Sequence, residues 1–337
     1  MIKTPEPLKK GDCIDLIAPS FGCSSEPYFS RLEKAITNFA KWGYRIKASR
    51  NVYLSDGLLA SASPEERAKE FMDSYLNKES KLTLSVGGGE IMMDMLPHID
   101  FKKIKEADPK WFMGFSDNTN LSFLLPTLSN VKAVYGPNAP SFISKKLDKS
   151  EKDALRLLEN DFSKYHTYSK WGYPPKEVKN PLARTKLNRE EKIINLGLKE
   201  EKGILLGGCI DVIASLIGTR FDNVVNFNKE NGPLVWMLES CDLNPISFYR
   251  VLNQMKFASY FVSTKAIVFG RPMHFKEEIM GINFIKAAEA ALKELNIPLI
   301  FDISLGHLYP SLPFVEGMQA SIRMKEKELE VEYHESR

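Results

Sequence analysis

Short apolar runs alternate with helical patterns along the first half of the chain. Residues 13–18 form an apolar run typical of a buried strand, and residues 28–42 carry apolar side chains at helical spacing. The next helix begins clearly, because Ser63 can cap it, Pro64 suits its first position and Glu66 completes a capping box. This order of elements predicts βα units.

Three further apolar runs end in loops that could carry chemistry. They are 82–86, which ends at the glycines 87–89, 111–115, which ends at Ser116, and 131–135, which ends at Gly136-Pro137. In open parallel α/β sheets the carboxyl ends of the strands form the crevice where ligands bind. We therefore expect an N-terminal α/β domain with a parallel sheet, residues 1–160, whose functional loops share one edge.

The second half of the chain repeats this alternation more loosely. Residues 161–200 are rich in proline, charge and aromatic side chains, which indicates an interdomain linker anchored by its aromatics or a flap over a substrate. Strands are expected at 204–206, 234–238, 265–269 and 298–303, helices near 209–217, 245–257 and 281–294, and a hairpin at 320–333. The pattern predicts a smaller C-terminal α/β domain, residues 201–337.

Composition narrows the class of protein. A length of 337 residues favours two domains, and the net charge of +3 is spread along the chain, which argues against nucleic acid as a partner. The four cysteines show no C-x-x-C spacing, so we expect them to be reduced and mostly in the core. The first residues lack the apolar core of a secretory signal, and no run of eighteen apolar residues predicts a membrane span. We expect a cytoplasmic protein that does not bind membranes.

Ser116 is the first candidate for chemistry. It would lie in a tight turn from strand to helix, which exposes the hydroxyl and leaves amide N–H groups free to stabilise an oxyanion. Asn118 replaces the second glycine of the G-x-S-x-G pattern. A serine that merely caps a helix is therefore an alternative.

A nucleophilic serine needs a base, and the chain has five histidines. His307 and His274 both follow predicted strands, and His307 has Gly306 before it and Pro310 after it, which indicates a rigid loop. We therefore place His307 ahead of His274. Glu239 ends the apolar run 233–238, where a carboxylate is costly without a partner, and it could orient the base. Its alternative is a structural role, bonded to nearby backbone amides or solvated.

The glycine run 87–89 fits neither nucleotide-binding pattern, G-x-G-x-x-G nor Walker A. We interpret it as backbone that approaches a ligand closely and directs an amide at a developing oxyanion. The sequence also lacks the spacings H-x-x-x-H and H-E-x-x-H and any acidic cluster with ligand spacing, so no metal site is predicted.

Taken together, these residues resemble the LD-carboxypeptidase and microcin C immunity family of serine peptidases over nearly the full chain. The matching segments, in order, are Leu8-Lys9-Lys10-Gly11-Asp12, Ile17-Ala18-Pro19-Ser20, Ser85-Val86-Gly87-Gly88-Gly89, Gly114-Phe115-Ser116-Asp117-Asn118-Thr119, Tyr135-Gly136-Pro137, Gly207-Gly208, Gly218-Thr219, Leu238-Glu239, and Gly306-His307 with Pro310. Each is short, but their combination and order are specific.

The resemblance implies two α/β domains with the active site at their interface, and no cofactor. Ser116 in the N-terminal domain would attack the substrate, with His307 as general base and Glu239 as the orienting carboxylate, both in the C-terminal domain. The backbone amides of Asp117 and of Gly88 or Gly89 would form the oxyanion hole. Family members often pair as homodimers, although this sequence shows no interface signature.

Two substrate classes follow from the resemblance: murein tetrapeptides, which lose a terminal D-alanine, and peptidyl or aminoacyl nucleotides of the microcin C type. The run Gly-Gly-Gly-Glu that ends at Glu90 and the long aromatic segment 161–200 resemble the microcin-immunity branch. Glu90 and Arg271 are candidate substrate-binding residues, because Arg271 follows a strand and could hold a substrate carboxylate.

One rival function stays open at this point, and a second is excluded by the residue at position 116. A protein with two lobes could close on a small ligand without catalysis, and its crevice would look the same. A glutaminase-like amidotransferase would need a cysteine where Ser116 stands, and none of the four cysteines lies in such a turn.

Overall fold

The structure is a computed structural model that describes residues 1–174 and 179–335. Residues 175–178 of the expected linker, Pro175 among them, and residues 336–337 at the end of the expected C-terminal domain lie outside the described residues. The chain divides into two compact units. Unit 1 comprises Met1–Asp161, Pro174–Thr185 and Pro313–Glu316, and unit 2 comprises Phe162–Tyr173, Lys186–Leu312 and Gly317–Arg337.

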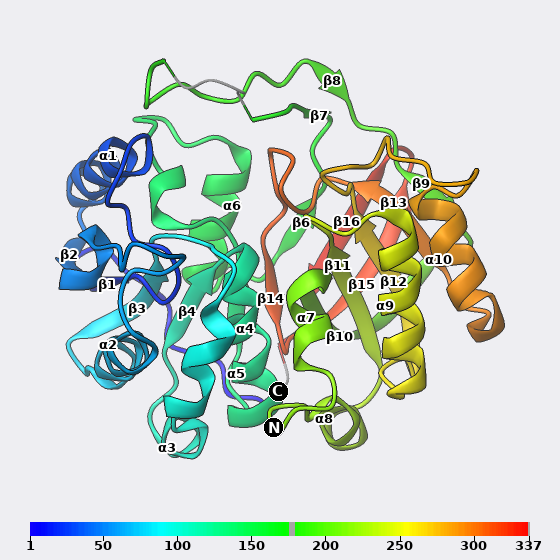
Figure 1. Cartoon of the computed structure of the whole chain (residues 1–337), viewed down its shortest axis with the longest axis horizontal. Coiled ribbons are helices and arrows are strands. Elements are labelled where there is room, and N and C mark those ends of the chain that lie inside the picture. The colour runs from blue at the N-terminus through cyan, green and yellow to red at the C-terminus, as the bar shows by residue number, and fades with distance from the viewer. Residues whose placement is uncertain (175–178, 336–337) are drawn as a thin grey trace. The chain divides into compact units, whose positions relative to one another are not determined.

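Unit 1 is built on a mostly parallel sheet (Figure 1). Its strands run in the order β14-β5-β4-β3-β1-β2, and only β14 is antiparallel to its neighbour among the pairs described. The strands are β1 (Cys13–Ile17), β2 (Arg45–Ala48), β3 (Ser80–Ser85), β4 (Trp111–Gly114), β5 (Ala133–Tyr135) and β14 (Phe314–Glu316). The predicted parallel α/β domain is confirmed, and β3, β4 and β5 bring their carboxyl ends to one edge.

Helices connect these strands. They are α1 (Tyr28–Lys41), α2 (Pro64–Leu76), α3 (Phe101–Glu106), α4 (Thr119–Ser122), α5 (Leu124–Ser129) and α6 (Lys149–Leu158), with 3-10 helices η1 (Arg50–Tyr53), η2 (Met92–His98), η3 (Ser116–Asn118) and η4 (Ala139–Ser141). The capping box at the start of α2 is confirmed, since the Ser63 hydroxyl accepts from the Glu66 N–H at 3.3 Å and the Glu66 carboxylate accepts from the Ser63 N–H at 3.3 Å. Helix α1 buries Leu32, Ala35 and Phe39 along one face, as its spacing predicts.

Unit 2 is built on a mixed sheet in the order β6-β16-β15-β10-β11-β12-β13-β9. Strands β10 to β13 are parallel at its centre, and the outer pairs are antiparallel. The bounds are β6 (Lys164–His166), β9 (Ile194–Leu196), β10 (Glu200–Cys209), β11 (Leu234–Glu239), β12 (Thr264–Gly270), β13 (Leu299–Ile303), β15 (Gln319–Lys325) and β16 (Glu328–Tyr333), with a separate pair β7 (Lys170–Trp171) and β8 (Arg189–Glu190).

The helices of unit 2 are α7 (Ile210–Leu216), α8 (Val224–Asn231), α9 (Pro245–Phe257), α10 (Phe284–Leu292) and the 3-10 helix η5 (Lys293–Leu295), and α9 and α10 lie side by side in Figure 1. Three of them, α7, α9 and α10, agree with the sequence pattern, whereas α8 was not predicted. The expected C-terminal hairpin is confirmed as β15 and β16. Strand β10 is longer than expected, because its first residues pair with β15 of that hairpin. No helix in the described ranges is long and apolar enough to cross a membrane.

Candidate active site

Ser116 lies in a sharp turn between β4 and the short helices that follow it. Its φ is +65°, in the left-handed region, which costs a non-glycine residue on the order of 1 kcal/mol. Phe115 before it is extended, and the 3-10 helix η3 begins at Ser116 itself. Backbone strain of this kind is typical of a turn that displays a nucleophile. The predicted strand and helix on either side of Ser116 are confirmed.

Ser116 is not the N-cap residue of either helix that follows β4. The N-cap residues of η3 and α4 are Phe115 and Asn118. The Ser116 backbone helps to hold the turn, since its N–H donates to the Tyr135 hydroxyl at 3.1 Å and its C=O accepts from Thr119 Oγ1 at 2.7 Å.

Asn118 explains why this turn keeps the first glycine of the G-x-S-x-G pattern, Gly114, and replaces the second. Its side-chain amide donates to the C=O of Gly87 at 2.8 Å and to the C=O of Phe115 at 2.9 Å. A Cβ added at Gly114 would lie 2.6 Å from the Asn118 Cβ, so a glycine is required there. The side chain that replaces the second glycine of the pattern therefore ties the Ser116 turn to the glycine turn.

The glycine turn 87–89 approaches Ser116 closely, as the sequence predicts. A Cβ at Gly88 would lie 3.0 Å from the Ser116 Cβ and 3.2 Å from its Oγ. Gly89 has φ +153°, and a Cβ there would lie 2.0 Å from Ser20 Oγ. Glu90 after the turn is exposed. The role of these amides as oxyanion donors, and of Glu90 in substrate binding, stays a prediction.

Unit 2 brings the other two candidate catalytic residues together. Glu239 is the last residue of β11 and is 2% exposed, and its Oε2 lies 2.9 Å from His307 Nδ1. The two residues come from different parts of the sheet, because Glu239 ends β11 and His307 lies in the loop after β13. This contact favours His307 over His274 as the base, and it supplies the partner that a carboxylate at the end of a buried strand needs.

The charge state of His307 depends on this contact. Burial by itself lowers the pKa of the imidazole, because a buried cation is poorly solvated. The Glu239 carboxylate and a hydrogen bond with Cys241 outweigh burial and raise the His307 pKa well above its usual 6.5. The pair therefore stabilises the imidazolium, which is the form that a general base reaches after it takes a proton.

The loop that carries His307 is shaped by Gly306 and anchored by its neighbours. Gly306 has φ +109°, and a Cβ there would lie 2.8 Å from Glu239 Oε2. Its N–H donates to Ser311 Oγ at 3.0 Å, and the Leu312 N–H donates to the C=O of Ser304 at 2.7 Å. The rigid loop expected from Gly306 and Pro310 has a physical basis in these contacts.

Cys241 contacts His307, although the sequence did not point to it as a functional residue and the four cysteines are predicted to be reduced and mostly core. Cys13, Cys23 and Cys209 are buried, whereas Cys241 is half-buried, two residues after Glu239. Burial raises the pKa of its thiol, and the hydrogen bond with His307 opposes this. The useful signal was its place in the loop that follows the strand of Glu239.

Arg271 is engaged by unit 2 itself. Its guanidinium lies 3.2 Å from Glu191 Oε2, donates to the C=O of Asp302 at 2.6 Å and stacks 4.3 Å from the centre of the Trp171 ring. The side chain is 4% exposed. Its role in holding a substrate carboxylate stays a prediction, and both of these hydrogen bonds use the same guanidinium nitrogen, Nη2.

The aromatic segment before residue 174 lies beside the His307 loop. The Gly172 N–H donates to the C=O of Tyr309 at 2.8 Å, and the Trp171 and Tyr173 rings contact each other and Phe275. These contacts lie within unit 2. They place aromatic surface near His307, but whether the segment serves as a linker or covers a substrate stays a prediction.

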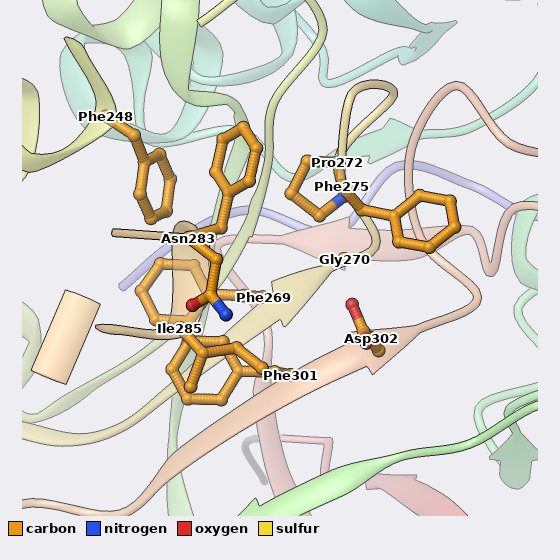
Figure 2. Close-up of a pocket in the computed structure, with 10 residues that line it drawn as sticks. Phe248, Phe269, Gly270, Pro272, Phe275, Asn283, Ile285, Phe301 and Asp302 are labelled. Carbon is orange, nitrogen blue, oxygen red and sulfur yellow. The ribbon is translucent and has the colours of Figure 1, made fainter. Parts of the chain in front are cut away.

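Figure 2 shows a small pocket at the carboxyl ends of β12 and β13. Its walls are mainly phenyl rings, among them Phe248, Phe269 and Phe301, and its volume is about 50 Å³. Ligand pockets usually measure about 300–1,000 Å³. This pocket is therefore too small to hold a peptide or a nucleotide.

Both halves of the chain match known protein domains. Residues 14–136 match the LD-carboxypeptidase N-terminal domain, and residues 202–322 match the LD-carboxypeptidase C-terminal domain. The chain belongs to the LD-carboxypeptidase family. The two matched ranges include Ser116 in the first and both Glu239 and His307 in the second, and the predicted resemblance is confirmed.

Relatives of this LD-carboxypeptidase family member include both putative peptidases and an immunity protein. It is 27% identical over 314 residues to the putative carboxypeptidase YocD of Bacillus subtilis, covering 92% of this chain and 93% of the relative. It is 21% identical over 332 residues to the microcin C7 self-immunity protein MccF of Escherichia coli, covering 96% and 94%.

Solved structures share its fold. An MccF-like protein from Bacillus anthracis superposes with a TM-score of 0.84 at 23% identity, covering 98% of this chain and 100% of the other. MccF in complex with aspartyl sulfamoyl adenosine gives 0.81 at 18% identity, covering 98% of each chain. These likenesses show the fold of the family member.

Proposed function

We propose that the protein is a serine peptidase or amidase that hydrolyses a peptide or amide bond through an acyl-enzyme. Ser116 is the nucleophile, His307 the general base and Glu239 the carboxylate that orients the imidazole. The contact of 2.9 Å between Glu239 Oε2 and His307 Nδ1 supports this most directly, because a buried carboxylate paired with a histidine is the base half of a Ser-His-Glu triad.

The proposed chemistry follows the usual two steps. His307 takes the Ser116 hydroxyl proton as Oγ attacks the carbonyl carbon, and it then gives this proton to the departing amine, so that the C–N bond breaks and an acyl-serine forms. Water, deprotonated by the same imidazole, then releases the acid and restores Ser116. Glu239 keeps the proton of His307 Nδ1 in place and stabilises the imidazolium.

The oxyanion of each tetrahedral intermediate needs donors that are already in position. The amide of Asp117, next to the nucleophile, and an amide of Gly88 or Gly89 are the proposed donors. The close approach of the Gly88 backbone to Ser116 supports the second of these.

Two substrate classes suit this chemistry: a murein L,D-peptide and a peptidyl or aminoacyl nucleotide of the microcin C type. The putative carboxypeptidases among the relatives favour the first class. The structures of MccF with aspartyl sulfamoyl adenosine and glutamyl sulfamoyl guanosine favour the second, as does the aromatic surface near His307. We give the nucleotide class the lead.

The alternative is a protein with two lobes that binds a small ligand without catalysis. It leaves the strained φ of Ser116 and the buried Glu239–His307 pair without a purpose, since binding alone needs neither.

The test is product analysis by mass spectrometry with the wild type and Ser116→Ala. Each is incubated with a murein tetrapeptide and, in parallel, with aspartyl sulfamoyl adenosine. We expect the wild type to cleave one of them, and Ser116→Ala to lose about 10⁴-fold or more in kcat while its thermal unfolding stays unchanged. Release of D-alanine assigns the murein class, and cleavage of the nucleotide conjugate assigns the other. Turnover that survives in Ser116→Ala, or no turnover by the wild type, contradicts the proposal.

A further inference from the structure

A buried carboxylate beside the nucleophile ties three loops of unit 1 together. Asp117 is 3% exposed. Its Oδ2 accepts from Ser20 Oγ at 2.6 Å and from the Met92 N–H at 2.9 Å, and its Oδ1 accepts from Asn120 Nδ2 at 3.0 Å. Hydrogen bonds to an ionised group are among the strong ones in proteins. The loop after β1, the start of η2 and the Ser116 turn therefore meet at one side chain.

Ser20 also lies against the glycine turn. It is fully buried, and the Phe21 N–H that follows it donates to the C=O of Gly88 at 2.9 Å. A Cβ at Gly89 would lie 2.0 Å from Ser20 Oγ, so the serine fills the space that this glycine leaves. The loop that carries Ser20 is also bonded to α2, since Arg67 Nη1 donates to the C=O of Pro19 at 3.1 Å.

These contacts hold the glycine turn at a set distance from Ser116, and the placement of the oxyanion donors depends on that distance. A Cβ at Gly88 would lie 3.0 Å from the Ser116 Cβ, so only the glycine backbone fits there, and the Gly88 C=O is hydrogen-bonded to the Ser20 loop. An oxyanion donor works only within a few tenths of an ångström of its ideal position. If the hydrogen bond between Ser20 and Asp117 is lost, the glycine turn should become more mobile both where it faces Ser116 and where it contacts the Ser20 loop.

We propose that Ser20 and Asp117 are positioning residues for the reaction at Ser116. Their buried hydrogen bond holds the glycine turn 87–89 against the Ser116 turn and so presets the backbone donors of the oxyanion hole. The inference rests on the proposed function, because it concerns the same reaction. Burial raises the pKa of the Asp117 carboxyl, and the hydrogen bonds from Ser20 and Met92 oppose this, so the donors also help to keep the carboxylate ionised.

The experiment uses a fluorophosphonate, which needs no knowledge of the natural substrate. Ser116 Oγ bonds to phosphorus, the P–F bond breaks, fluoride leaves, and the base takes the serine proton; the phosphoryl oxygen then occupies the oxyanion hole. The second-order labelling rate is measured for wild type, Ser20→Ala, Asp117→Asn and the double variant. Ser129→Ala is the matched control, because Ser129 is another fully buried serine of unit 1, whose hydroxyl donates to the C=O of Phe101 at 2.8 Å.

We expect Ser20→Ala and Asp117→Asn each to slow labelling about tenfold or more, since loss of one oxyanion donor outright costs about 10²–10³-fold. The double variant should lose no more than the slower single variant, because both act through one hydrogen bond. Ser129→Ala should label at the wild-type rate. Hydrogen exchange measured by mass spectrometry should show faster exchange of the backbone amides of 86–92 in Ser20→Ala and not in Ser129→Ala.

The outcomes distinguish a failure of the positioning role of Ser20 and Asp117 from a failure of the proposed function. A wild type that labels at Ser116 together with a Ser20→Ala variant that labels and exchanges at the wild-type rate overturns the inference and leaves the proposed function standing. Equal losses in Ser20→Ala and Ser129→Ala also overturn it, since they would reflect stability alone. A wild type that does not label at Ser116 overturns the proposed function, and the inference with it.

Discussion

Glu239 and Asp117 are both buried carboxylates, but their partners give them different tasks. Glu239 faces an imidazole that can exchange a proton, and the contact raises the His307 pKa. Asp117 faces a hydroxyl, an amide and a backbone N–H, which only donate to it here. The first arrangement suits acid–base chemistry, whereas the second suits the positioning of backbone.

At this scale we predict the effect of Glu239→Gln. The variant should lose about 10²–10⁴-fold in kcat, because the neutral amide cannot stabilise the imidazolium or hold the imidazole in its tautomer. In the proposed reaction His307 acts as a base only when it is neutral, so activity should rise with pH through the His307 pKa. Removing the carboxylate lowers that pKa, and the rising limb of kcat/KM against pH should move to lower pH.

The check is the pH profile of the fluorophosphonate labelling rate or of kcat/KM. Cys241→Ala is the comparison, because the Cys241 hydrogen bond also raises the His307 pKa. It should shift the limb in the same direction and keep most of kcat. A limb that stays in place in Glu239→Gln would show that this carboxylate does not control the base.

At the scale of elements, the candidate residues of each unit lie in loops that follow strands. The loops after β3, β4, β11 and β13 carry the glycine turn, Ser116, Cys241 and His307. Glycines allow these loops to come close to functional side chains, as at Gly306, where both φ and space exclude a larger residue. A parallel sheet gathers such loops at one edge, so the candidate residues could be found from the ends of apolar runs.

Gly306→Ala tests this use of glycine. Its φ of +109° strains any L residue, and its new Cβ would collide with Glu239 Oε2 at 2.8 Å. We expect a loss of about 2 kcal/mol or more in unfolding free energy and a large fall in kcat. Gly197→Ala in the same unit is the matched control, because its φ is +95° and nothing lies within 4 Å of the added Cβ. It should cost only about 1 kcal/mol and keep activity.

Urea unfolding and kcat are measured for both variants. Equal effects of the two substitutions on kcat would mean that strain alone, and not the contact with Glu239, sets the requirement at residue 306.

At the scale of the whole molecule, the proposed triad takes Ser116 from unit 1 and Glu239 with His307 from unit 2. Activity then requires that both units stay folded, so the pH dependence of global stability matters as much as that of the base. We expect a half-buried carboxyl of unit 1 to contribute to it. Glu70 in α2 lines a cavity of about 370 Å³ beside β1 and η1. It accepts from the Ala18 N–H at 2.9 Å and from Ser49 Oγ.

Glu70→Gln should change how stability depends on pH. Burial raises the Glu70 pKa to about 7 from the usual 4.5, so the folded state holds this proton more tightly than the unfolded state does. Unfolding free energy should therefore fall as pH rises from 4.5 to 7, by about 2–3 kcal/mol. The glutamine keeps an acceptor for Ala18 and carries no charge, so it should remove this fall.

The measurement is urea unfolding at several pH values between 4 and 9. Glu79→Gln, which changes an exposed carboxyl of the same unit, serves as the control and should keep the wild-type slope. The prediction is wrong if Glu70→Gln and the wild type lose stability in parallel over this interval.

Local patterns predicted the longer strands, most of the longer helices and the candidate residues, because all of these depend on local information. Apolar periodicity located β1, β11 and α9, and chemistry at the ends of apolar runs pointed to Ser116, Glu239 and His307. Short pieces with distant partners escaped it. Strand β14 is three residues long and pairs with β5 in the sheet of unit 1. In the sequence it follows β5 only after most of unit 2. Nothing local marks such a strand.

The tertiary structure alone decided which side chains meet. It paired Glu239 with His307, brought Ser20 to Asp117, placed Cys241 beside His307 and enclosed Arg271 with Glu191. These pairs are far apart in sequence or lie on different elements. Their contacts depend on strand order and on the packing of loops, and no local pattern of apolar and polar positions encodes either one. Local physics therefore identifies which residues can react, and long-range packing determines their charge states and positions.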